Sequence, residues 1–197
     1  MSLRRSSVLL FILILTATAF VSCGGNSEKN TEKTPETIVK DAAETNEEDI
    51  SYVSEDISFG IFFDREGTKR TTDLKKGQKQ LQVFVIVQVP EFIEIAAAQW
   101  QLSLPEGLEI DVDRYHKDRV MSLGQMPFGI SERFKPCLPG PKAIIHELTL
   151  NITSELKNAT LSILPSKDGN FLGIANCTEG FPQERASSYK AVVNPGN

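Results

Sequence analysis

The sequence predicts an all-β domain, an antiparallel β-sandwich, and three observations support this prediction. From about residue 50 onward, apolar residues recur with a period of two, which is the spacing of one face of a strand. Glycine and proline residues typical of turns separate these apolar segments at short intervals. No segment of helical length in this region carries an apolar stripe at the 3.6-residue period.

The first two expected strands lie at the start of this region. In the segment DISFGIFFD (residues 56–64), every second residue from Ile57 onward is apolar. The segment QLQVFVIVQV (residues 80–89) alternates in the same way, but Phe84 and Ile86 make its second face apolar as well. Apolar character on both faces predicts a strand in the middle of a sheet.

The next expected strands follow the same rule. In AAAQWQLSLPEGLEI (residues 96–110), Trp100 and its apolar neighbours two positions away face inward, the glutamines face outward, and a Pro-Glu-Gly turn follows. Alternate residues from Ile144 to Ile152 are expected to face the core, with His146 among them. The remaining expectations are short strands near residues 159–163, 171–175 and 189–193, and a mostly irregular segment over residues 111–141.

The N-terminus has the pattern of a targeting signal. Arg4 and Arg5 precede an unbroken run of apolar and small residues over positions 8–21, which is the length expected of the apolar part of a signal peptide. The run is short for a membrane-spanning helix, which needs about 20 apolar residues. The segment FVSC that ends at Cys23 resembles the lipobox of bacterial lipoproteins, with Phe20 departing from the leucine-like residue usual at that position.

The lipobox resemblance implies where the protein is located. In lipoproteins the cysteine thiol is acylated, so residues 1–22 would be a removable signal peptide and Cys23 would carry the lipid, such as palmitate. The resemblance therefore implies a lipid-anchored protein of the bacterial cell envelope, at the outer membrane or the cell surface. The alternative is an ordinary secretory signal with an incidental cysteine near the cleavage site.

Residues 23–49, which begin with the lipidated Cys23, are expected to be a disordered acidic tether. The stretch is rich in Glu, Lys, Thr and Asn and contains almost no large apolar residue, so it buries too little surface to offset its conformational entropy. A solvated spacer that holds residues 50–197 away from a lipid surface is the favoured interpretation. A binding tail is the alternative.

Charge and cysteine count narrow the classes of function. A net charge of −5 does not favour a nucleic-acid partner, because such surfaces are normally basic. Once Cys23 is assigned to lipid, Cys137 and Cys177 remain as an even pair in an oxidising compartment, and one disulfide is the simplest interpretation. A metal site is less favoured because neither cysteine has a CxxC or Cys/His spacing.

Part of the domain resembles a known family. The segment KKGQKQLQVFVIVQVPEFIEIAAAQWQLSLPEGLEI (residues 75–110) looks like the first half of cohesin-type sandwiches, which are related to immunoglobulin-like sandwiches. The segments FGIFFDREGTKRT (residues 59–71) and CLPGPKAIIHELTL (residues 137–150) are similar to uncharacterised secreted sandwich domains. The resemblance implies the sandwich architecture. Cohesins bind dockerin modules, but a single copy behind a lipid anchor departs from that arrangement, and dockerin binding is not carried over.

Few residues point to a ligand. Asp111, Asp113 and Asp118 are weak candidates for a cation site, because Ca²⁺ needs roughly six to eight oxygen ligands and fewer are visible here. A solvated acidic loop is the alternative. Candidates for a ligand surface are Tyr115 and the phenylalanines Phe128 and Phe134, since long loops on a rigid sandwich often carry binding sites.

Catalytic motifs are absent from the sequence. No serine lies in a G-x-S-x-G context, and no phosphate-binding loop or HExxH motif occurs. The favoured hypothesis is therefore a non-enzymatic, lipid-anchored interaction or structural module without a cofactor, whose partners are the membrane and an unidentified protein or glycan. The first alternative is a carbohydrate-binding module. A less favoured one is an envelope hydrolase that would use His116 or His146.

Overall fold

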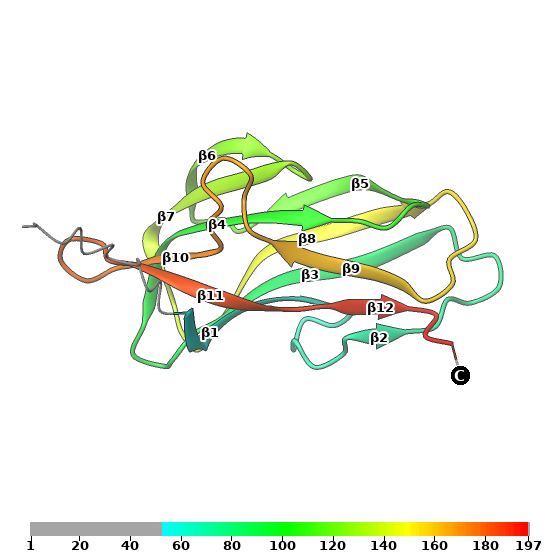
Figure 1. Ribbon diagram of the computed structural model, residues 1–197, viewed down its shortest axis with the longest axis horizontal. Helices are drawn as coiled ribbons and strands as arrows, with labels where there is room; N and C mark the ends of the chain where they lie inside the picture. The colour runs from blue at the N-terminus through cyan, green and yellow to red at the C-terminus, as the bar shows by residue number, and fades with distance from the viewer. Residues whose placement is uncertain (1–52, 197) are drawn as a thin grey trace, which may run out of the picture. The chain divides into compact units, whose positions relative to one another are not determined.

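The computed structural model describes residues 53–196, which consist of strands, turns and loops (Figure 1). Within these residues no helix is long and apolar enough to cross a lipid bilayer. The predicted signal peptide (residues 1–22), the lipid site Cys23 and the predicted tether (residues 23–49) lie outside the described residues.

One layer of the sandwich contains the first described strand. It consists, in spatial order, of β11 (Gln183–Tyr189), β1 (Val53–Phe62), β3 (Gln80–Gln88), β8 (Lys142–Ile152) and β5 (Leu108–Tyr115). β1 and β11 are parallel, and the other pairs of this layer are antiparallel. β5 is the free edge of this layer, because β8 is its only strand partner in the described chain.

The second layer is antiparallel throughout. It consists of β10 (Gly173–Asn176), β4 (Glu94–Ser103), β7 (Gly129–Pro139) and β6 (Arg119–Gln125). β10 pairs with β4 and also with β11, so the two layers are joined along this side. The end of β4 continues into a smaller ladder made of β9 (Ala159–Leu164), β12 (Ala191–Val193) and β2 (Thr71–Thr72).

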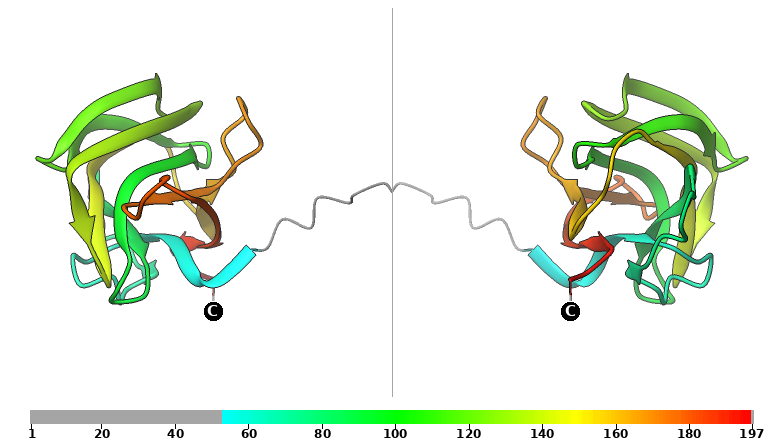
Figure 2. Two further views of the ribbon diagram at one scale, coloured as in Figure 1. Left: turned by 90° about the vertical axis from the view of Figure 1, so that its left-hand side faces the viewer. Right: turned by 90° about the vertical axis from the view of Figure 1, so that its right-hand side faces the viewer.

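The predicted all-β sandwich is confirmed, and its core lies where the period-two pattern places it. Figure 2 views the domain along its long axis and shows the strands curving around a common interior. Trp100 is 0% exposed, and its neighbours Ala98 and Leu102 are buried with it. Burying a large apolar side chain stabilises a fold by roughly 1.5–3 kcal/mol, so this shared core holds the two layers together.

β3 is a central strand, as its two apolar faces predict. Its inward residues join the main core, and Phe84 and Ile86 on its outer face form a second small cluster with Phe62 and Ile144. The guanidinium of Arg65, from the loop after β1, lies 5.7 Å from the centre of the Phe84 ring. The loop between β1 and β2 therefore borders this outer cluster.

The expected alternation of β8 is wrong at its beginning. Ile144 was expected to face the core, but Ile145 is 0% exposed and Ile144 packs on the outer cluster. The cause is a shift of register between β3 and β8, where Val85 lies opposite His146 and Ile86 lies opposite Ile144. A bulge adds one residue to a strand and reverses the alternation on one side of it.

The expectation of an irregular segment over residues 111–141 is also wrong. β5 extends to Tyr115, and β6 and β7 occupy most of the remainder. β6 is almost entirely exposed, and β5 is exposed beyond its first residues. Edge strands of this kind lack an alternating apolar face, which is the signal that identifies a strand from sequence.

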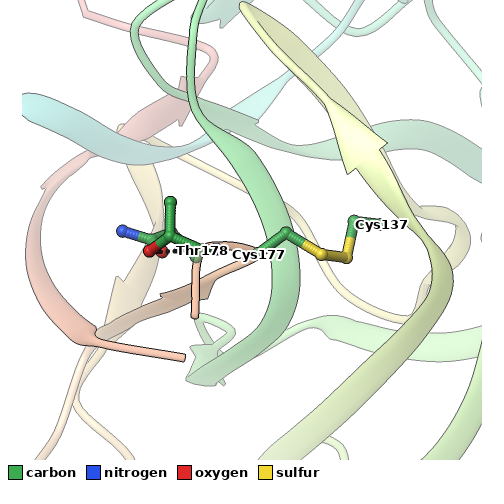
Figure 3. Close-up of a disulfide and its surroundings, with 4 residues drawn as sticks. Cys137, Cys177 and Thr178 are labelled. Atoms are coloured by element: carbon green, nitrogen blue, oxygen red, sulfur yellow. Dashed lines mark hydrogen bonds between the residues drawn. A yellow bond between two sulfur atoms is a disulfide. The ribbon is translucent and has the colours of Figure 1, made fainter. Parts of the chain in front are cut away.

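The structure contains the Cys137–Cys177 disulfide (Figure 3). Cys137 lies on β7 and Cys177 directly follows β10, and these are the two strands that flank the first half of β4. The backbone N–H of Cys177 donates to the carbonyl oxygen of Glu94 on β4, at 2.9 Å. The disulfide therefore links the two neighbours of β4 across that strand.

We predict that the double substitution Cys137→Ser and Cys177→Ser lowers the free energy of unfolding by about 3–4 kcal/mol. The bridge joins residues 40 positions apart, and opening a loop of that size increases the entropy of the unfolded chain. Denaturant unfolding measures the change, with Cys23→Ala as a control that removes a cysteine but keeps the bridge. An unchanged unfolding midpoint in the double variant would contradict the prediction.

Candidate functional site

A buried carboxylate is the centre of the most extensive polar network in the described chain. Glu132 on β7 is 1% exposed and accepts hydrogen bonds from three side chains. Trp100 Nε1 on β4 donates to Oε1 at 3.0 Å, while His146 Nε2 on β8 lies 2.9 Å from Oε2. Arg119 on β6 donates to the same Oε2 atom at 3.2 Å. A buried charge needs such partners, because burying it unpaired is costly.

His146 connects this carboxylate to a second one. Its side chain is 0% exposed, and its Nδ1 atom lies 2.6 Å from Oδ1 of Asp113 on β5. A neutral imidazole has a single N–H donor, whereas both ring nitrogens face carboxylate oxygens here. The geometry therefore favours the imidazolium form, which donates to Asp113 and Glu132 together.

The pKa of His146 is raised. Burial acts to lower it, but the hydrogen bonds from the ring to Asp113 and Glu132, together with the charges of both carboxylates, outweigh burial. The His146 ring also packs edge-on against Trp100, with 5.2 Å between ring centres. Because Asp113 and His146 lie in one layer while Glu132, Trp100 and Arg119 lie in the other, the network connects the two layers.

The environment of His146 differs from that of the histidine in a hydrolase. A hydrolase would need a histidine and a carboxylate beside a nucleophile in an accessible cleft. His146 has two carboxylates beside it, but its ring is fully buried and both of its nitrogens are engaged. Nδ1 of the other histidine, His116, accepts a hydrogen bond from the backbone N–H of Asp118 at 3.2 Å.

The three aspartates proposed as weak cation ligands do not lie together in one site. Asp111 Oδ2 accepts a hydrogen bond from Gln80 at 3.0 Å, whereas Asp113 contacts His146. Asp118 lies near His116 and Lys117 in the turn after β5. A bulge at Asp111, between Ile110 and Val112, changes the simple alternation of the strand. Among residues 53–196 no group of three or more His, Cys, Asp or Glu side chains is placed to hold a metal ion.

The three aromatic candidates for a ligand surface are in different environments. Tyr115 is 53% exposed, and the Arg119 guanidinium covers its ring at 3.4 Å. Phe128, in the turn between β6 and β7, is 62% exposed. Phe134 is 2% exposed and packs edge-on against His116, so it belongs to the core and not to a surface. The alternation of β7 turns Phe134 to the same side as Glu132.

Sequence reasoning named Phe128 as a candidate for a ligand surface but missed the apolar residues of β6 beside it. Val120, Met121 and Leu123 on this strand and Phe128 in the following turn are each about half exposed or more. We refer to these four residues as the β6 patch. The first three lie on an edge strand that pairs only with β7 in the described chain. The signal in the sequence was the string RVMSLGQMPF, whose apolar residues have no strict period.

The comparisons with known proteins identify a fold. No protein-family model and no curated protein matches the sequence. A cohesin module from a family 33 glycoside hydrolase of Clostridium perfringens is similar in structure, with 9% identity, a TM-score of 0.51 and coverage of 73% of this chain and 100% of that one. A type III cohesin from a cell-surface anchoring scaffoldin of Ruminococcus flavefaciens has 8% identity, a TM-score of 0.48 and coverage of 73% and 89%.

A type I cohesin from Pseudobacteroides cellulosolvens gives a similar result, with 11% identity, a TM-score of 0.47 and coverage of 71% of this chain and 92% of that one. At these identities the likeness concerns the fold alone. The chain has a cohesin-like β-sandwich, as the resemblance of residues 75–110 predicts.

We predict that protonated His146 makes the stability of the domain depend on pH. The folded-state pKa is raised above the ordinary value of about 6.5. The contribution of protonated His146 to the free energy of unfolding is therefore fully present below about pH 6.5, and it is lost as pH rises through the folded-state pKa. Thermal unfolding between about pH 6 and about pH 9 measures this loss in the wild type and in His146→Gln.

The chain has two histidines, so His116→Gln is a matched control. We expect His116→Gln to keep the fall in melting temperature with rising pH and His146→Gln to lack it. Equal pH profiles for all three proteins would contradict the role assigned to His146.

Proposed function

We propose that this protein is a non-enzymatic protein-interaction module of the bacterial cell envelope, anchored by lipid on Cys23, and that the β6 patch contacts its partner. One observation carries the interaction proposal. Ten large apolar side chains are exposed in the described chain, and six of them lie between residues 111 and 141. Exposed apolar residues that gather in one region of a domain surface are typical of an interaction site, whereas single scattered ones are not.

The position of the β6 patch supports a protein partner. Within the described chain β6 has one free edge, so backbone N–H and C=O groups are available beside the exposed apolar side chains. A partner strand pairs with such an edge through its main chain and gains specificity through its side chains. The opposite edge of β6 is held by β7, which is fixed to the core through Phe134 and Glu132.

A carbohydrate-binding module requires exposed aromatic faces on which sugar rings stack. Several exposed aromatic rings in the described chain instead have an arginine placed over them. Arg119 covers Tyr115 at 3.4 Å, Arg70 lies 5.0 Å from the Tyr189 ring, and Arg133 lies 6.0 Å from Phe181. These contacts leave three rings less accessible to a sugar, whereas Phe92 and Phe128 are 85% and 62% exposed, so the preference for a protein partner rests on the free edge of β6 in the described chain.

For the lipid anchor, the test is the substitution Cys23→Ala. Without the thiol no acyl chain can be attached, so we expect the protein to move from the membrane fraction to the soluble fraction. Cell fractionation followed by intact-mass measurement detects both the release and the missing lipid. Retention in the membrane fraction of a Cys23→Ala protein whose mass shows that residues 1–22 have been removed, or a wild-type mass without lipid, would contradict the anchor.

For the β6 patch, the test is the double substitution Leu123→Ser and Phe128→Ser. Truncating two residues at the centre of an interface typically weakens binding by more than about tenfold. We expect that loss in the yield of the partner recovered by in-cell cross-linking and mass spectrometry. The matched control is Phe92→Ser with Leu164→Ser, which removes the same residue types from exposed positions elsewhere. Equal loss in both double variants, or in neither, would contradict the proposal.

A further inference from the structure

A basic cavity lies beside β8, outside the β6 patch. It has a volume of about 500 Å³ and lies between the loop after β1, the end of β5 and the beginning of β8. We use the term basic cavity for this space and for the four cationic side chains that line it, Arg65, Arg114, Lys117 and Lys142.

The positive charge of this cavity is only partly compensated. Glu147 is the one acidic residue among the described residues that line it, and the Glu147 carboxylate is 2.7 Å from the Arg65 guanidinium. The Lys117 ammonium lies 3.5 Å from Asp118 at an exposed position. Arg114 lies opposite Glu147 in the ladder between β5 and β8, but the Glu147 carboxylate pairs with Arg65, and no ion pair of Arg114 occurs among the side chains described for residues 56–196. In a chain of net charge −5, this is a local excess of cations that favours an anionic ligand.

The walls of the cavity are fixed by other contacts. Asp64 accepts hydrogen bonds from the backbone N–H groups of Thr68 and Lys69, at 2.8 Å and 2.9 Å, which shape the loop that carries Arg65. Lys142 donates to the backbone carbonyl oxygen of Glu66 in that loop. Leu138, which lines the cavity, is 1% exposed and belongs to the core. A ligand therefore meets a largely formed site, which reduces the entropic cost of binding.

Beside the basic cavity, the beginning of β8 lacks a neighbouring strand on one side in the described chain. β5 pairs with β8 as far as Tyr115 opposite His146, and His116 then donates its backbone N–H to the Ile145 carbonyl oxygen at 2.9 Å. Residues 142–144 of β8 pair with β3 on one side, and no strand of the described chain pairs with them on the other side. Main-chain groups and cationic side chains therefore meet at the same cavity.

We propose that the basic cavity binds an acidic polypeptide segment in extended conformation. Its carboxylates pair with Arg114 and Lys117, and its main chain pairs with residues 142–144 of β8 in line with β5. Free main-chain groups recognise a peptide, whereas an acidic polysaccharide offers no amide ladder to pair with them. This inference rests on the proposed function as an interaction module, and it names the chemistry of one partner.

The test measures binding of a fluorescent hexaglutamate peptide to the full-length protein at low and high salt. We expect binding that weakens as salt rises, and an affinity about tenfold lower in the Arg114→Gln, Lys117→Gln double variant. The matched control is Lys75→Gln with Lys76→Gln, which removes the same charge from an exposed loop and should retain wild-type affinity. Matching melting temperatures show that each variant is folded.

Two further probes test the polypeptide part of the proposal. Hexaglutamate with N-methylated amides keeps its charge but cannot donate to β8, and we expect it to bind about fivefold more weakly. An oligogalacturonate of equal charge should also bind more weakly than hexaglutamate. Equal binding by these probes, or equal losses in the Arg114/Lys117 and Lys75/Lys76 variants, would overturn the inference. A cell partner that needs the β6 patch but not Arg114 and Lys117 would overturn it too, while leaving the proposed function intact.

Discussion

The rest of the structure depends on the need to satisfy one buried carboxylate. Glu132 is enclosed by the core, and its oxygens require donors from several directions. Trp100, His146 and Arg119 supply them from three different strands. Removing one of the three donors leaves a buried carboxylate oxygen less well compensated, which is more costly than losing an exposed ion pair. The network therefore favours one relative arrangement of β4, β6, β7 and β8.

This constraint also explains how the exposed features are positioned. Asp113 extends the network to β5, the free edge of one layer, and Arg119 extends it to β6, the free edge of the other. The turn that joins these two edges carries His116 and Lys117, which line the basic cavity. The Arg119 guanidinium contacts Glu132 on the inside and the Tyr115 ring on the outside. Both proposed binding surfaces are thus built on strands that a common set of buried hydrogen bonds keeps in place.

The sequence predicted the strands and their inward faces where one face of the strand is buried, and it did not do so where the strand is exposed. The alternation around Trp100 and along β3 predicted the correct faces, because strict period two requires one buried side. The alternation did not reveal most of β5 and β6, because their residues are exposed and need no apolar face. It gave the wrong face for Ile144, because a bulge in β8 reverses the alternation there. The Glu132–His146 contact joins residues on different strands, so no local pattern contains it. His146 in an apolar rhythm was the one sequence signal for a hydrogen-bonded core histidine.

The parallel pairing of β1 with β11 has a mechanical consequence. From Val53 opposite Arg185 to Gly60 opposite Tyr189, the first and last long strands of the domain run in the same direction side by side. The ladder has two parts, at residues 53–54 and 58–60 of β1, separated by a register shift. A force that pulls on the N-terminal end of β1 acts along both parts and not across them, so the hydrogen bonds within each part are loaded together. β3 holds the other edge of β1 in the same shear geometry. The domain is therefore built to resist extension from the end at which the predicted lipid anchor would hold it.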